Sequence, residues 1–117
     1  MKLAIISDIH ANLEALQATL QQISAQTVDR IVCLGDIVGY NANPEECISL
    51  LREFDVLCIA GNHDRAVTGQ ITTEGFSHTA ARAVAWTREQ LGSDAIEFLA
   101  SRPMWGRFVP PHCATWR

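Results

Sequence analysis

The stretch Ser7-Asp8-Ile9-His10-Ala11-Asn12 directly follows the apolar run Leu3-Ala4-Ile5-Ile6. A short apolar run that contains isoleucines and stops at polar residues is typical of a buried strand. Because side chains two residues apart in an extended chain lie on the same side, we expect Asp8 and His10 to converge. One carboxylate oxygen and one imidazole nitrogen suit a divalent transition metal better than Ca²⁺ or Mg²⁺. Alone, such a pair is more often a surface ion pair or a helix cap.

Two later segments repeat this pattern of an apolar run followed by polar residues. Gly35 and Asp36 follow the predicted strand at residues 31–34, and the tetrad Gly61-Asn62-His63-Asp64 follows the predicted strand at residues 56–60. Three motifs of one kind, each at the end of a strand, make a shared site a much better interpretation than three coincidences.

The segments between the strands predict how the strands are connected. Leucines and an isoleucine recur at three- and four-residue spacing over residues 11–25, which indicates an amphipathic helix. A second helix is expected from a cap at Asn43 to about residue 52, with Pro44 in its first turn. Helices between strands at this spacing predict an α/β fold with a parallel sheet of βαβ units. The three motifs then meet at the carboxyl edge of the sheet, where such folds bind ligands.

The last third of the chain predicts two more helices and an unusual tail. Ser77 and Ser93 are candidate caps of the two helices, the second of which ends near residue 100, and Trp86 is expected in the core. Residues 103–117 contain three of the four prolines and two of the three tryptophans. We therefore divide the chain into a domain at residues 1–102 and an atypical tail at residues 103–117.

The composition predicts a soluble globular protein. The chain has 117 residues, of which 48% are hydrophobic and 19% charged, and its formal net charge is −4. No basic patch for nucleic acid is present, so bound metal ions would have to hold an anionic substrate. No apolar run approaches the roughly 18 residues of a membrane span, and we expect a cytoplasmic protein. The four cysteines form no CxxC pair and are expected to be reduced: Cys33, Cys47, Cys58 and Cys113.

Taken together, the Asp-x-His, Gly-Asp and Gly-Asn-His-Asp motifs resemble the calcineurin-like metallophosphoesterase superfamily. Further similarity to a bacterial branch of it covers residues 7–16, 34–40, 43–47 and 85–91, and the resemblance as a whole covers residues 1–102. It implies the parallel βαβ half of an α/β/β/α sandwich, with the C-terminal half of the sheet missing.

The resemblance also implies a cofactor and its ligands. A complete site would hold two divalent metal ions, with Mn as the first expectation and Fe, Zn or Mg as alternatives. Asp8 and His10 would bind the first ion, Asp36 would bridge both ions, and Asn62 would bind the second.

The implied activity is hydrolysis of a phosphomonoester or phosphodiester by a metal-activated hydroxide. His63 would be the catalytic histidine, with Asp64 orienting it. The implied partner is a small phosphate ester or a nucleotide.

One departure from the family pattern weakens the implied site. The family continues with another metal-binding histidine and a G-H-x-H motif, but only His78 and His112 stand outside the matched motifs here. We therefore expect poor affinity for the second metal and low intrinsic activity from a truncated domain. The alternative is a catalytically silent remnant that binds metal or phosphate and acts through association, as a homo-oligomer formed through an exposed apolar face.

Each motif also has a simpler interpretation. Asp8 could be the nucleophile of an aspartyl-phosphate enzyme, although His10 stands where those enzymes need a second carboxylate. Asp36 could cap the following loop. Asn62 and His63 could form an ordinary turn.

Other polar residues near the motifs have expected structural roles. Asn12 and Tyr40 lie close to the same edge of the sheet, where helix capping and packing are expected of them rather than substrate contact. His78 is expected to start a helix and to have no catalytic role.

Overall fold

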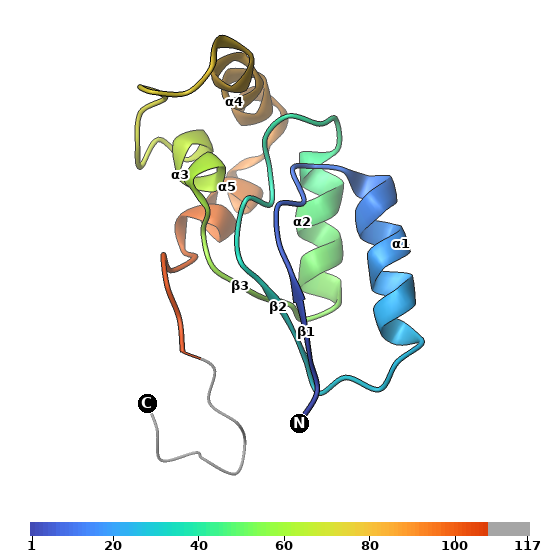
Figure 1. Cartoon of the computed structure of the whole chain (residues 1–117). Coiled ribbons are helices and arrows are strands. Elements are labelled where there is room, and N and C mark those ends of the chain that lie inside the picture. Colours follow the sequence, from blue (N-terminus) through green and yellow to red (C-terminus); the bar gives the residue numbers. More distant parts are fainter. Residues whose placement is uncertain (108–117) are drawn as a thin grey trace.

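Figure 1 shows the computed structural model of the chain, which describes residues 1–107. Three parallel strands form one sheet in the order β1-β2-β3, with bounds Leu3–Ile6, Arg30–Cys33 and Leu57–Cys58. The register aligns Ile5 with Val32, and Val32 with Leu57. The predicted parallel α/β architecture is confirmed.

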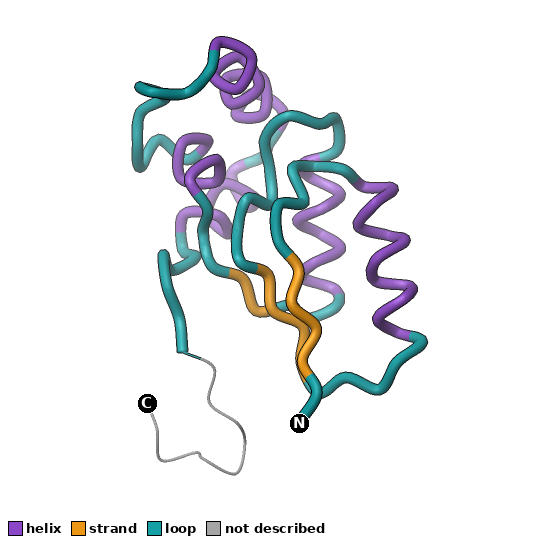
Figure 2. Tube along the Cα trace, viewed as in Figure 1, coloured by secondary structure: helices purple, strands orange, loops and turns teal. Residues whose placement is uncertain are grey.

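Five helices complete the described part of the chain. Two of them connect the strands and lie on one side of the sheet, as Figure 1 shows: α1 (Leu13–Ser24) and α2 (Pro44–Glu53). Three follow β3 and pack beyond its carboxyl end: α3 (Asn62–Val67), α4 (His78–Gln90) and α5 (Ser93–Ala100). Figure 2 shows that long loops at this end of the sheet join the orange strands to the purple helices.

The core begins between the sheet and its two connecting helices and continues among the three helices after β3. Leu16 and Leu20 of α1 are buried and belong to one cluster with Cys33 and Cys58 of the neighbouring strands. Full burial of a leucine side chain stabilises the folded chain by about 1.5–3 kcal/mol. The amphipathic pattern that predicted α1 is thus the pattern that attaches it to the sheet.

The opposite face of the sheet carries an exposed apolar row, which consists of Ile5, Val32 and Leu57. These residues are register partners, and register partners in a parallel sheet point to the same face. Ile5 is 62% exposed and Leu57 is 42% exposed. In the part of the chain that the structure describes, only the segment after α5 approaches this side, where the Ala60 N–H donates to the Pro103 carbonyl at 2.7 Å.

Two of the predicted helix starts are confirmed. The Asn12 side chain accepts a hydrogen bond from the Ala15 N–H at 3.1 Å, so Asn12 caps α1. The Ser77 hydroxyl accepts from the Ala80 N–H at 3.1 Å and caps α4, whose first residue is His78.

One further predicted cap is confirmed in position, and one is wrong. Asn43 is the N-cap residue of α2 and Pro44 lies in its first turn, but the Asn43 side chain makes no capping bond. The Asn43 backbone N–H instead donates to the Ala11 carbonyl at 3.1 Å. Helix α5 is preceded by Gly92, and Ser93, the predicted cap, is already its first helical residue.

Three further expectations differ from the structure. Trp86 is 41% exposed on α4 rather than part of the core. The third strand is shorter than the predicted residues 56–60, although the Ile59 N–H still donates to the Cys33 carbonyl of β2 at 3.0 Å and the Ala60 N–H donates to the segment after α5. Helix α3 follows this strand directly, and its short polar sequence gave no helical periodicity.

The cysteines and the tail are described in part. Cys33, Cys47 and Cys58 are buried free thiols, as expected of reduced cysteines. Of the predicted tail at residues 103–117, only residues 103–107 lie within the described part, so Cys113 and His112 fall outside it. Within residues 1–107, no helix combines the length and apolar character that crossing a membrane requires.

Candidate metal centre

Three of the predicted ligands meet at the carboxyl edge of the sheet. Asp8, His10 and Asp36 each offer one ligand atom, and these atoms all lie within 4.8 Å of one another. The His10 Nε2 atom is 3.5 Å from Asp8 Oδ1. Two carboxylates and one imidazole at this spacing can hold a single divalent ion, and we call these three residues the ligand cluster.

The backbone brings Asp8 and His10 together in a way that the sequence did not predict. Asp8, His10 and Ala11 have φ values of 56°, 47° and 59°, so this loop is left-handed rather than extended. The loop is fixed to the one after β2 by two backbone hydrogen bonds, from the His10 N–H to the Asp36 carbonyl at 2.9 Å and from the Ala11 N–H to the Ile37 carbonyl at 2.8 Å. The expected convergence is confirmed, but its expected cause, alternation along a strand, is wrong.

The His10 ring is oriented for metal binding. Its Nδ1 lies 3.0 Å from the Val38 carbonyl oxygen, and since a carbonyl only accepts, Nδ1 carries the proton. In the neutral imidazole the other ring nitrogen, Nε2, is the one that can bind a metal, and it faces Asp8. Metal-ligating histidines characteristically donate their second N–H to a carbonyl or carboxylate in this way. The donor set and its orientation therefore fit a divalent metal.

Asp36 is held by a close contact between the loops after β2 and β3. Its Oδ1 atom accepts a hydrogen bond from the His63 backbone N–H at 3.0 Å. The contact requires two glycines. A Cβ on Gly35, whose φ is 101°, would lie 2.5 Å from the Gly61 nitrogen, and a Cβ on Gly61 would overlap the Asp36 carboxylate.

Asp64 lies behind the ligand cluster and is fully buried. Its Oδ1 accepts from the N–H groups of Ile37 and Val38 at 2.9 and 3.1 Å, and its Oδ2 accepts from the Gly61 N–H at 2.9 Å. Burial raises the pKa of Asp64 to about 6, and the three backbone donors oppose that rise. The carboxylate is therefore ionised at neutral pH and joins the loop after β2 to the start of α3.

His63 is placed beside the ligand cluster but is not oriented by Asp64. Its ring centroid is 4.8 Å from that of His10, and the Asp64 oxygens are bonded to backbone groups instead of the imidazole. The His63 Nδ1 is buried without a hydrogen-bond partner among the described residues. Asp64 can orient His63 only through the backbone of α3, and a catalytic role of either residue stays a prediction.

Burial governs the charge of His63. The side chain is buried, and its ring packs between Tyr40 and Phe76 with centroid distances of 4.9 and 5.0 Å. Burial lowers the pKa of His63, whereas the nearby Asp36 carboxylate raises it. The net direction is downward, so the imidazole is neutral at pH 7.

Asn62 is exposed and is the first residue of α3. It directly precedes the His63 amide that donates to Asp36. Asn62 therefore lies at the contact between the loops after β2 and β3, next to the ligand cluster. Its binding of a second metal stays a prediction.

Two aromatic residues near the site were not predicted as parts of it. Tyr40 was expected to pack, and its ring does pack on both His10 and His63, while the residue is 49% exposed. Phe76 comes from the loop before α4, and a lone aromatic residue beside Gly75 is the only signal that the sequence gives for it.

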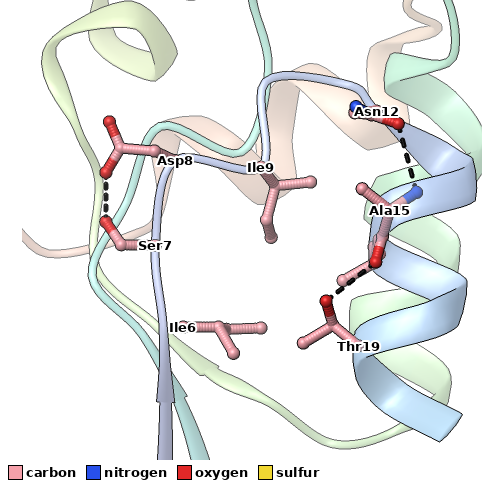
Figure 3. Close-up of a pocket in the computed structure, with 8 residues that line it drawn as sticks. Ile6, Ser7, Asp8, Ile9, Asn12, Ala15 and Thr19 are labelled. Carbon is pink, nitrogen blue, oxygen red and sulfur yellow. Dashed lines mark hydrogen bonds between the residues drawn. The ribbon is translucent and has the colours of Figure 1, made fainter. Parts of the chain in front are cut away.

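A cavity of about 270 Å³ lies next to the ligand cluster, between β1 and α1. Figure 3 shows the side chains of Ile6 and Ile9 in this space, whereas the Asp8 carboxylate points away from α1 and bonds to the Ser7 hydroxyl. Of the three cluster residues only Asp8 lines it. The cavity is a neighbour of the metal centre rather than the centre itself.

The fold and the ligand cluster define an α/β domain with a candidate metal site at its carboxyl edge. A family model described as calcineurin-like phosphoesterase matches residues 1–110. The chain therefore belongs to the calcineurin-like phosphoesterase family, and the predicted resemblance is confirmed.

Individual relatives agree with this assignment. The chain is 45% identical over 102 residues to an uncharacterized protein of Methanocaldococcus jannaschii, covering 87% of this chain and 42% of that protein. It is similar to a metallophosphoesterase from Sphaerobacter thermophilus, with 43% identity, a TM-score of 0.70, and coverage of 88% of this chain and 42% of that one. A hypothetical protein from Pyrococcus horikoshii shares the fold at 22% identity and a TM-score of 0.77, with coverage of 86% and 47%.

The chain thus spans less than half the length of each of these relatives. Its three-stranded sheet matches their N-terminal part, which confirms the expected βαβ half of the family fold.

Proposed function

We propose that the chain supplies the first metal position and the catalytic histidine of a metal-dependent phosphoesterase. The observation that carries the proposal is the ligand cluster, which the loops of a calcineurin-like phosphoesterase fold hold within 4.8 Å. When bound, divalent ions would polarise the phosphoryl group and supply the attacking nucleophile near neutral pH. The oxygen and nitrogen donors favour Mn, with Fe, Zn or Mg as alternatives.

The residues of this chain have distinct tasks in the proposed reaction. Asp8 and His10, whose ligand atoms lie 3.5 Å apart, would hold the first ion. Asp36, whose Oδ1 accepts from the His63 N–H, would share its carboxylate with a second ion. Asn62 would contribute a side-chain oxygen to that second position.

The His63 imidazole contacts the phosphoryl group. Its neutral form can donate a hydrogen bond there, and its cationic form can protonate the leaving oxygen. Burial disfavours the cation, while Asp36 and Asp8 favour it. The proposed substrate is a phosphomonoester or phosphodiester of a small molecule or a nucleotide.

The first test compares hydrolysis of an aryl phosphomonoester and an aryl phosphodiester with and without Mn²⁺. We expect slow, Mn²⁺-dependent turnover that Asp36→Asn abolishes, together with Mn²⁺ binding in calorimetry that the substitution weakens at least about tenfold. Asp94→Asn is the matched control, because its side chain is 84% exposed and pairs with Arg52 far along the surface. Mn²⁺ binding that is equally tight in Asp36→Asn would contradict the proposal.

One observation favours a second candidate function. Within residues 1–107 the ligand cluster offers only three metal-binding groups, which is a short ligand set for two ions. In this second candidate function the chain binds metal or phosphate and acts through association, without turnover. Tight, Asp36-dependent Mn²⁺ binding combined with no hydrolysis would select this candidate.

A further inference from the structure

The backbone holds Tyr40 in an unusual conformation beside the ligand cluster. Its φ is 65°, a left-handed value that bulky residues rarely adopt. The Asn41 N–H donates to the Gly39 carbonyl at 2.9 Å, so Tyr40 is the central residue of a three-residue γ-turn. The same N–H lies 3.2 Å from the His10 carbonyl, which ties the turn to the metal-binding loop.

Burial of the ring does not explain this conformation. The Tyr40 side chain is 49% exposed, and its hydroxyl makes no hydrogen bond with the described residues. What the turn does achieve is to place the ring 4.9 Å from the rings of both His10 and His63. Strained residues of this kind, when the surrounding structure over-determines them, cluster at ligand sites.

We propose that Tyr40 binds the organic group of the substrate, and that this group is planar and aromatic, as in an aryl or nucleoside phosphate. This inference rests on the proposed function, since the phosphoryl group must lie at the ligand cluster. A group esterified to that phosphoryl then extends past His10 or His63, where the exposed ring of Tyr40 is the adjoining surface. Aromatic rings pack on one another in offset or edge-on geometry, and every nucleobase offers a face for such packing.

Binding of two phosphonates that cannot be hydrolysed separates this role from catalysis. Phenylphosphonate and methylphosphonate present the same phosphoryl oxygens, but only the first has an aromatic group. In calorimetry with Mn²⁺, we expect the chain to bind phenylphosphonate about tenfold more tightly than methylphosphonate. Tyr40→Phe keeps this preference, whereas Tyr40→Leu removes it and leaves the affinity for methylphosphonate unchanged.

A second measurement needs no substitution. Tyr40 is the only tyrosine of the chain, so incorporation of 3-fluorotyrosine gives a single fluorine resonance. With Zn²⁺ as the diamagnetic ion, phenylphosphonate is expected to shift this resonance much further than methylphosphonate does.

Two results would overturn the inference while leaving the proposed function intact. One is an equal affinity of the unaltered chain for both phosphonates, and the other is an equal loss of both affinities in Tyr40→Leu, which would show that Tyr40 only supports the histidines. If neither phosphonate binds in a Mn²⁺-dependent manner, the proposed function is overturned, and this inference with it.

Discussion

Asp64 joins two segments of the chain, the loop after β2 and the start of α3, through one carboxylate. Its oxygens accept from the amides of Ile37, Val38 and Gly61, and no part of the residue is exposed. Replacing a buried carboxylate that accepts from three backbone donors destabilises the folded chain, because each donor left without a partner has already lost its hydrogen bond to water. The residue thus positions the metal site from behind, through backbone groups.

Asp64→Asn is predicted to lower the free energy of unfolding by about 1–3 kcal/mol, since the amide replaces one acceptor oxygen with a donor. Urea denaturation at neutral pH measures the change. Asp94→Asn, at an exposed carboxylate, serves as the control and should stay within about 0.5 kcal/mol of the unaltered chain. Equal stability of the two variants would show that the three hydrogen bonds contribute nothing net.

The difference in unfolding free energy between the unaltered chain and Asp64→Asn is predicted to change with pH in a definite direction. Burial raises the pKa of Asp64 to about 6 in the folded chain, above its unfolded value of about 3.9. The folded state therefore holds the proton more tightly, so this contribution to stability is fully present below pH 4 and is lost as the pH rises through 6. Because Asn cannot titrate, the deficit of Asp64→Asn should grow between pH 7.5 and pH 4.5, and a constant deficit would contradict the raised pKa.

The site residues show which contacts could be predicted from sequence. Asp8, His10 and Asp36 were predicted because each stands next to a strand, and the order of strands in a parallel sheet brings their ends together. The Val38 carbonyl that orients His10 is a backbone group, and no residue type encodes it. Tyr40 was expected to pack, which its contacts with His10 and His63 confirm, but its partial exposure depends on a turn that the sequence does not reveal.

At the scale of elements, the metal site depends on how closely the loops after β2 and β3 approach. Gly61 has an ordinary extended ψ and a φ of −84°, so its backbone conformation does not require glycine. What requires glycine is the space, because a Cβ there would overlap the Asp36 carboxylate. The side chain of one metal ligand thus leaves no room for a side chain on the neighbouring loop.

Gly61→Ala is accordingly predicted to displace Asp36 and to weaken Mn²⁺ binding at least about tenfold, as measured by calorimetry. Gly92→Ala is the matched control, because Gly92 also has a negative φ and nothing lies within 4 Å of its added Cβ. Similar Mn²⁺ affinities in both alanine variants would show that the loops separate without moving Asp36.

The elements themselves were predicted unevenly, and for physical reasons. The first two strands and α1 carry their own signal, because each strand is a short apolar run and the one-sided burial of α1 imposes a three- and four-residue period. The end of the third strand and α3 make contacts with residues distant in sequence: Ile59 bonds to Cys33 and Ala60 to Pro103, and α3 is held by Asp64 and the Asp36 contact. Contacts that are distant in sequence leave no local pattern, so these boundaries could not be predicted.

At the scale of the whole molecule, helices cover only one face of the sheet within residues 1–107. The apolar row of Ile5, Val32 and Leu57 lies on the other face, where the segment after α5 borders a pocket that Val32 and Leu57 also line. An apolar surface on a sheet that has β1 as an edge strand favours association.

We therefore predict that this 117-residue chain self-associates at micromolar concentration and that Ile5→Lys shifts it towards the monomer, as measured by sedimentation velocity. Trp86→Lys is the control, since Trp86 is an exposed apolar residue on α4, away from the sheet. A monomeric chain, or an equal shift by both substitutions, would rule out the apolar row as the interface.

The left-handed backbone of the motif loops has a consequence for how such a site tolerates variation. Asp8, His10, Asp36 and Tyr40 all have positive φ values, and among residues with side chains, Asn, Asp and His adopt such values most readily. Two independent pressures, chemistry and backbone geometry, thus restrict the same positions. If variants were measured only by protein abundance, Asn or Gly in place of Asp8 or Asp36 would be tolerated and Val would not, even with no metal present. Intolerance at these positions is therefore not, by itself, a signature of function.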